Sequence, residues 1–156
     1  MNIANLVDTT ELKKIKGLNA ILLAGQAGNA TGNIVADVVL GKSIPSGKLT
    51  DTWAASYEDY PSSKNFSHNN GDTNDEYYSD GIYVGYRYFE TFAPEKVMYE
   101  FGFGLSYTEI SMETVKAEST GNGKDAKIAL SIRVKNTGAA AGKEAAQVYV
   151  LSLIHI

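Results

Sequence analysis

The spacing of apolar residues predicts two helices and a strand in the first part of the chain. Leu18 to Gly25 form a continuous apolar run, which is typical of a buried strand in a parallel sheet. From Ala30 to Leu40 the apolar residues recur at helical spacing, and Gly41 lies where a helix C-cap is expected. A shorter helix is predicted over Thr10 to Lys16. Helix, strand and helix in this order indicate an α/β layer.

A long polar stretch follows and leads into an aromatic segment. Ser43 to Asp80 contains many turn residues and little apolar periodicity, so we expect a long loop that is functional or lies over another domain. From Ile82 to Arg87, larger apolar residues alternate with small or polar ones, which predicts a strand. Seven of the ten tyrosines lie between Tyr77 and Tyr107, interleaved with glycines.

The last part of the chain has a period of two. Apolar residues alternate with polar or small ones from Ile128 to Val134, which predicts a half-buried strand, and Asn136 to Gly138 supply a turn. A further strand is predicted to begin at Gln147. These strands resemble the start of a β-sandwich, which needs about seven strands, so we expect an incomplete sandwich whose apolar face is exposed.

Length and composition limit the classes of protein and partner. The 156 residues are enough for one domain, or for one domain and part of another. The net charge of −4, with scattered lysines and arginines, argues against nucleic acid as a partner. No segment reaches the ~20 apolar residues of a membrane span. No signal peptide is predicted at the start, and the absence of cysteine leaves the compartment open.

Most catalytic and cofactor motifs are rejected on spacing. The glycines that follow Leu23 do not match a dinucleotide fingerprint, and neither Gly41-Lys42 nor Gly47-Lys48 completes a phosphate-binding loop. This disfavours a small α/β nucleotide binder. The two histidines, His68 and His155, are too few for a zinc site, so no metal site is predicted. No nucleophile elbow for a hydrolytic triad occurs.

Carboxyl groups and tyrosines remain as candidates. Glycosidases use two carboxyl groups, one as acid and one as nucleophile or base. The carboxyl groups in or near the aromatic segment are those of Asp72, Asp75, Glu76, Asp80 and Glu90. The tyrosines either stack on sugar rings or form a seam between two domains, with each hydroxyl finding a partner. We favour the seam and keep the sugar platform as the alternative.

Four stretches, in this order and at this spacing, carry a resemblance to a known family. They are AILLAGQAGNATGNIVADVVLGKSIPSGKLTDTWA (Ala20–Ala54), DGIYVGYRYFETF (Asp80–Phe92), YEFGFGLSYT (Tyr99–Thr108) and KNTGAAAGKEAAQVYV (Lys135–Val150). Together they resemble the C-terminal part of glycoside hydrolase family 3, the β-glucosidase and β-xylosidase family. The resemblance covers nearly the whole chain up to Val150.

The resemblance implies a piece of a three-part enzyme. In this family a (β/α) barrel supplies an aspartate nucleophile, an α/β sandwich supplies a glutamate acid/base, and a fibronectin type III-like domain packs against both. We therefore expect the end of the α/β sandwich at residues 1–56, a linking loop and aromatic seam at 57–110, and a truncated all-β fibronectin type III-like sandwich at 111–150. Residues 151–156, LSLIHI, resemble a translated sequencing adapter and are predicted to be a non-native tail.

The resemblance also sets the expected function. The parent is expected to hydrolyse terminal non-reducing β-D-glucosyl or related residues by a retaining mechanism, with a β-glucoside or oligosaccharide bound through the barrel and no cofactor. Neither catalytic carboxylate is carried over onto this chain, so the chain alone is expected to be inactive. Asp80, Tyr83 and Arg87 are expected at the rim of the substrate site, although many relatives have glutamate where Asp80 stands. The alternative is a stand-alone carbohydrate-binding or interaction module that uses the tyrosine-rich stretch.

Overall fold

The computed structural model describes residues 1–3 and 5–149 of the chain. The α-helices are α1 (Thr10–Lys13), α2 (Thr31–Val39) and α3 (Tyr86–Phe92), and the strands are β1 (Trp53–Ala54), β2 (Val97–Tyr99), β3 (Ile110–Thr120) and β4 (Lys127–Asn136). Short 3₁₀ helices span Gly28–Ala30, Tyr57–Asp59, Phe66–His68, Pro94–Lys96 and Gly123–Asp125. None of the described helices has the length and apolar character that a bilayer crossing requires.

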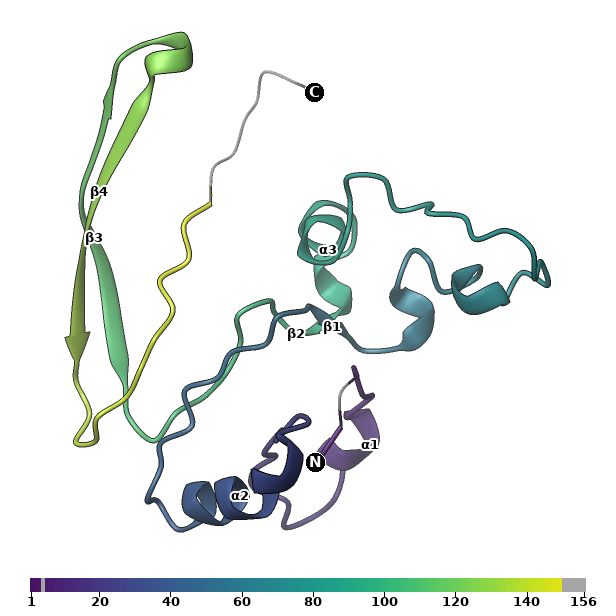
Figure 1. Cartoon of the computed structure of the whole chain (residues 1–156), viewed down its shortest axis with the longest axis horizontal. Coiled ribbons are helices and arrows are strands. Elements are labelled where there is room, and N and C mark those ends of the chain that lie inside the picture. Colours follow the sequence, from purple (N-terminus) through teal and green to yellow (C-terminus); the bar gives the residue numbers. More distant parts are fainter. Residues whose placement is uncertain (4, 150–156) are drawn as a thin grey trace.

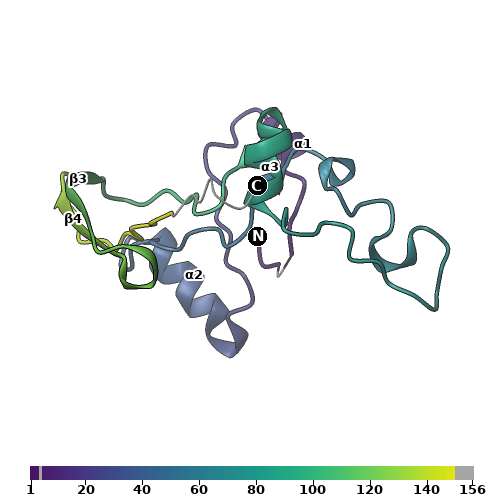
Figure 2. The ribbon, with the colours of Figure 1, turned by 90° about the horizontal axis from the view of Figure 1, so that it is seen from above.

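These elements are spread out in space. The hairpin of β3 and β4 lies on one side of α3, and the polar loop that precedes α3 extends on the other (Figure 1). The view from above shows the same separation (Figure 2). The central part joins the short antiparallel pair β1–β2 to α3, and the two-stranded sheets do not pair with each other.

The predicted helix over Ala30 to Leu40 is confirmed as α2. Its end has the hydrogen bonds of a Schellman cap, in which the N–H of Gly41 donates to the C=O of Val38 (3.0 Å) and the N–H of Lys42 to the C=O of Asp37 (2.8 Å). Gly41 takes a φ of 71°, which glycine adopts without the steric penalty of a side chain. α1 forms as well, but it ends at Lys13 and is shorter than predicted.

The predicted buried strand at Leu18 to Gly25 is wrong for this structure. No strand is assigned there, and Leu18, Ile21 and Leu23 are exposed. The segment does form two hydrogen bonds with Met1 in the pattern of parallel strands. The amino group of Met1 donates to Leu22 O (2.6 Å), and Ala24 N–H donates to Met1 O (2.8 Å). A parallel strand is buried by strands on its flanks and helices on its faces, and the described residues supply no such layer.

The predicted strand from Ile82 to Arg87 is also wrong, because the chain turns there and then forms α3. Gly85 takes a φ of 60° and caps the N-terminal end of the helix. Phe89 and Ala93 then lie one turn apart on the face that is buried, at a spacing typical of a helix. Apolar or aromatic residues occupy four of the six positions from 82 to 87, and so dense a run fits a period of two and a period of 3.6 equally well, which explains the error.

The alternation from Ile128 to Val134 is confirmed as strand β4, which pairs antiparallel with β3. The face that carries Met112, Leu130 and Ile132 is exposed, so the prediction that the strand is half-buried is wrong, and the expected exposure of this apolar face is confirmed. Residues 147–149 are not in a strand. Val150 and the predicted non-native tail, including His155, lie outside the described residues.

The buried core is small for a chain of this length. Its buried apolar residues are Trp53, Ala54, Phe89 and Ala93. The accessible surface is 12144 Å², whereas a compact monomer of this mass exposes about 7,600 Å². The excess of about 4,500 Å² is larger than the share of one partner in most stable protein–protein interfaces. The structure is therefore an open one with much surface available for other protein to cover.

Candidate functional site

A large hollow lies beside α3. Its volume is about 1170 Å³, and its walls come from α3 and the turn before it, from the segment after β2, and from residues 144–149. Three chain segments that are distant in sequence therefore meet around one space. The walls are rich in aromatic side chains, including Tyr83, Tyr86, Phe101 and Tyr149.

The aromatic rings around this hollow pack mainly against one another. The ring of Tyr83 meets that of Phe92 at 4.8 Å between centroids, in an edge-to-face arrangement. Tyr86 lies 5.3 Å from Phe101 and 5.7 Å from Tyr149. Such pairs contribute about 0.5–1.5 kcal/mol each beyond the area they bury. The rings thus hold the three segments together.

The structure brings together two of the three predicted rim residues. Tyr83 and Arg87 both line the hollow, and the Arg87 guanidinium carbon lies 5.7 Å from the centre of the Tyr86 ring. Asp80 does not line it. One carboxylate oxygen of Asp80 is buried and has no hydrogen-bond partner among the described residues, while the Asp80 carbonyl accepts the N–H of Tyr83 (2.9 Å). Asp80 therefore positions the turn before α3 through its backbone.

The other candidate carboxyl groups do not form a catalytic pair with these residues. Glu90 lines the hollow, whereas Glu76 lies 3.6 Å from His68 in the polar loop. The backbone N–H groups of Asn74 and Asp75 donate to Asp72 and hold the pKa of its carboxyl below the usual value. A general acid needs a raised pKa, so Asp72 is unsuited to that role. Within residues 1–3 and 5–149, no three His, Asp or Glu side chains are grouped to bind a metal ion.

A polar junction, made of Ser46, Lys48, Gly104 and Glu144, connects residues 144–149 to the rest of the molecule. The Lys48 ammonium donates to Gly104 O (2.6 Å) and pairs with Glu144 (2.9 Å), and both side chains are about four-fifths buried, at 17% and 20% exposure. The N–H of Lys143 donates to Ser46 Oγ (3.2 Å). The Lys48 hydrogen bond, followed by that of Ala145 N–H, lowers the pKa of the Glu144 carboxyl.

Sequence reasoning missed this junction. The pattern at Gly47-Lys48 resembles only an incomplete phosphate-binding loop, and no local pattern indicates that Lys48 pairs with Glu144. The one usable signal is the glycine at position 104, because a Cβ there would overlap the backbone oxygen of Gly47. A glycine at such a position permits two backbones to approach closely.

The sequence profile described as "Glycosyl hydrolase family 3 C-terminal domain" matches residues 1–86. Beta-glucosidase A of Butyrivibrio fibrisolvens is 46% identical over 96% of this chain, which covers 19% of that protein. The structure of beta-glucosidase 3B from Thermotoga neapolitana, in complex with glycerol, matches 90% of this chain and 19% of its own, at 38% identity and a TM-score of 0.77. A beta-glucosidase from Paenibacillus barengoltzii matches 76% of this chain and 12% of its own, at 45% identity and a TM-score of 0.68.

Proposed function

The chain belongs to glycosyl hydrolase family 3, and on this basis we propose that it forms one part of an enzyme that hydrolyses terminal non-reducing β-D-glucosyl or related residues. The observation that carries the proposal is the extent of the similarity, which runs over 96% of the chain in a β-glucosidase sequence and 90% in a β-glucosidase structure. The chain spans about a fifth of these relatives. The two catalytic carboxyl groups of the retaining mechanism then come from other parts of the enzyme.

The proposal assigns a different role to each stretch of the chain. Residues 1–56 are the end of an α/β sandwich, residues 57–110 the linking loop and aromatic seam, and residues 111–150 the start of a fibronectin type III-like domain. The exposed apolar face of the β3–β4 hairpin supports the last assignment, because a β-sandwich buries one face of each sheet. The surface excess of about 4,500 Å² also supports it, since such a surface needs protein to cover it.

The aromatic segment acts as a seam in this proposal. Edge-to-face contacts occupy the rings of Tyr83 and Tyr86, and the Tyr107 hydroxyl donates to Val38 O (3.1 Å), which links the segment to α2. A sugar platform instead needs open ring faces. Tyr78, with an exposed fraction of 95%, has one, but no other observation favours the platform. Tyr83 and Arg87, which line the hollow beside α3, are assigned to the rim of the substrate site.

A segment exchange tests the proposal. The matching segment of β-glucosidase 3B is replaced by residues 1–149 of this chain, and the replacement enzyme is assayed with para-nitrophenyl β-D-glucoside. We expect hydrolysis by the replacement enzyme and none by the chain alone. A folded replacement enzyme that binds the glucoside without hydrolysing it would contradict the proposal.

The assignment of Arg87 to the rim of the substrate site is tested separately, by the kinetic constants of the replacement enzyme. Arg87→Ala is expected to raise KM severalfold with little change in kcat, because a rim residue contributes to ground-state binding. Arg133→Ala, on the exposed hairpin, is the matched control and should change neither constant. If Arg87→Ala and Arg133→Ala had the same KM and kcat, Arg87 would not lie at the rim of the substrate site.

A further inference from the structure

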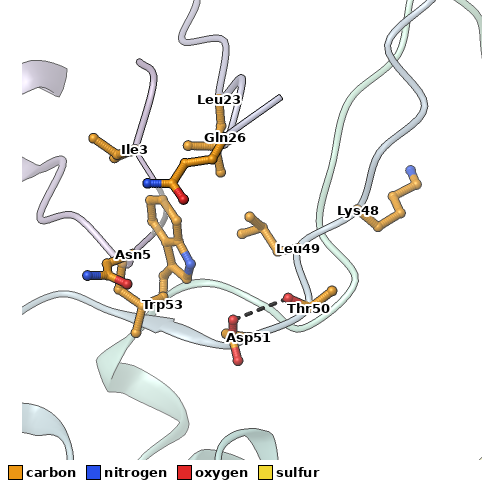
Figure 3. Close-up of a pocket in the computed structure, with 11 residues that line it drawn as sticks. Ile3, Asn5, Leu23, Gln26, Lys48, Leu49, Thr50, Asp51 and Trp53 are labelled. Atoms are coloured by element: carbon orange, nitrogen blue, oxygen red, sulfur yellow. Dashed lines mark hydrogen bonds between the residues drawn. The ribbon is translucent and has the colours of Figure 1, made fainter. Parts of the chain in front are cut away.

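The chain contains two Asn-Gly pairs, Asn70-Gly71 and Asn122-Gly123. In such a pair the backbone nitrogen of the glycine can attack the side-chain carbonyl carbon of the asparagine, because glycine has no side chain to shield that nitrogen. Each of the other asparagines precedes a residue with a side chain. For example, Asn5, which lines the same small hollow as Trp53 (Figure 3), precedes Leu6. The two Asn-Gly pairs are therefore the candidate sites of spontaneous deamidation.

Both pairs are exposed to solvent. Asn70-Gly71 belongs to the polar loop that precedes α3, whereas Asn122-Gly123 belongs to the turn between β3 and β4. This turn forms the free end of the hairpin (Figure 1). A Cβ built on Gly71 or on Gly123 would meet no heavy atom within 4 Å beyond its neighbours in the chain. Access of water and crowding of the glycine therefore do not distinguish the two pairs.

Hydrogen bonds occupy both reacting groups of the pair Asn70-Gly71. The N–H of Gly71 donates to His68 O (2.9 Å), and Asn70 Oδ1 accepts the N–H of Asp72 (3.0 Å). The attack requires the glycine nitrogen to give up its proton and to approach the side-chain carbon. Both hydrogen bonds must break first, and each of them lowers the population of the reactive geometry.

The pair Asn122-Gly123 has no such bonds. The Asn122 side chain makes no capping hydrogen bond, and the N–H of Gly123 donates to no group among the described residues. Ring closure needs a rotation about the Cα–C bond of Asn122. The contact that opposes this rotation is the hydrogen bond from Asp125 N–H to Asn122 O (3.2 Å). The carboxamide and the glycine nitrogen are thus free to react.

We propose that Asn122 is a site of spontaneous deamidation. The nitrogen of Gly123 forms a bond to Asn122 Cγ, the Cγ–Nδ2 bond breaks, and the amide leaves as ammonia with the proton of the Gly123 N–H. Water then opens the resulting cyclic imide. Cleavage of the imide bond to Cγ gives aspartate, and cleavage of the bond to the backbone carbonyl carbon gives isoaspartate. The reaction uses water alone and goes beyond the proposed function, on which it does not depend.

The modification changes the free end of the hairpin in charge and in length. Either product adds one carboxylate, close in sequence to Lys124 and Asp125. Isoaspartate also carries the main chain through its side-chain carbon. It therefore lengthens by one backbone atom the turn that the Thr120–Lys127 pair closes.

Peptide mapping of the whole chain tests the proposal, because trypsin separates the two pairs. Asn122 falls in the peptide Ala117–Lys124, and Asn70 falls in the peptide Asn65–Arg87. After incubation at mildly alkaline pH, the mass gain from replacement of NH₂ by OH should accumulate about tenfold faster at Asn122, because two hydrogen bonds protect Asn70. Chromatography should resolve both aspartate and isoaspartate forms of the first peptide, since direct hydrolysis of the carboxamide gives no isoaspartate.

Two controls separate the effect of the structure from that of the sequence. In guanidinium chloride the two peptides should convert at similar rates, because the hydrogen bonds to His68 and from Asp72 are then lost. Gly123→Ala should slow conversion at Asn122 severalfold and leave Asn70 unchanged, because a methyl group next to the nitrogen hinders its attack. Equal rates in the native chain, faster conversion of Asn70, or aspartate without isoaspartate would overturn the proposal.

Discussion

Replacement of Phe89 with alanine is expected to unfold the central part of the chain. Phe89 is 1% exposed and packs against the rings of Tyr60 (5.5 Å) and Tyr88 (5.2 Å). Removal of a fully buried phenylalanine side chain costs about 3–5 kcal/mol, from the lost transfer free energy and the cavity left behind. A core this small supplies at most about 3–5 kcal/mol of net stability. The variant therefore has no stability left.

The assay is urea unfolding of the chain followed by Trp53 emission, at low protein concentration. Trp53 lies in β1 next to Ala54, which belongs to the same core as Phe89, so its emission reports this region. We expect a transition for the parent chain and, for Phe89→Ala, the emission of the unfolded chain before urea is added. Phe92→Ala is the control in the same helix, because Phe92 is 57% exposed and its loss should cost about 1 kcal/mol.

A comparable midpoint for the two variants would refute this reasoning. It would mean that α3 does not bury the face that carries Phe89. A parent chain without any transition would likewise show that this core does not form.

Three further predictions concern the junction and the hairpin. Lys48 holds the pKa of the Glu144 carboxyl below its ordinary value of 4.5. The stability that this ion pair adds to the folded chain is therefore complete above pH 4.5 and is lost as the pH falls through the lower pKa of the folded state. In the Glu144→Gln variant, the melting temperature should depend less on pH in this range. Gly104→Ala should cost about 1–3 kcal/mol in urea unfolding by overlap with the backbone at Gly47, whereas Gly47→Ala, with open space, should cost less. Ile132→Lys should reduce the binding of a hydrophobic dye to the chain, because it interrupts the exposed apolar face of the β3–β4 hairpin. Unchanged binding would show that the dye does not bind to this face.

Local pattern was sufficient where an element needs only its own residues. The helix α2 carries its apolar spacing and its glycine cap within a dozen residues, and β4 carries its alternation and pairs with a strand close in sequence. Both were predicted correctly. The family resemblance was equally predictable, because four separated stretches agree in order with one family.

Elements that depend on distant partners were predicted poorly. The apolar run at Leu18 to Gly25 has the composition of a buried strand but lacks the layers that would bury it among the described residues. The pairing of Lys48 with Glu144 joins segments far apart in the chain and leaves no local signal. For the rim residues, the structure brings Tyr83 and Arg87 to one hollow and leaves Asp80 outside it, so their role in substrate binding stays a prediction.

The value of kcat/KM for the replacement enzyme tests the central claim most directly. It is measured with para-nitrophenyl β-D-glucoside beside β-glucosidase 3B itself and beside a replacement enzyme that carries Phe89→Ala. We predict a value within about tenfold of the parent enzyme, a difference of about 1.4 kcal/mol in transition-state stabilisation, and a much lower value when the core of α3 is removed. A replacement enzyme that is folded but hydrolyses the glucoside no faster than its Phe89→Ala version would contradict the claim that this chain is part of a β-glucosidase.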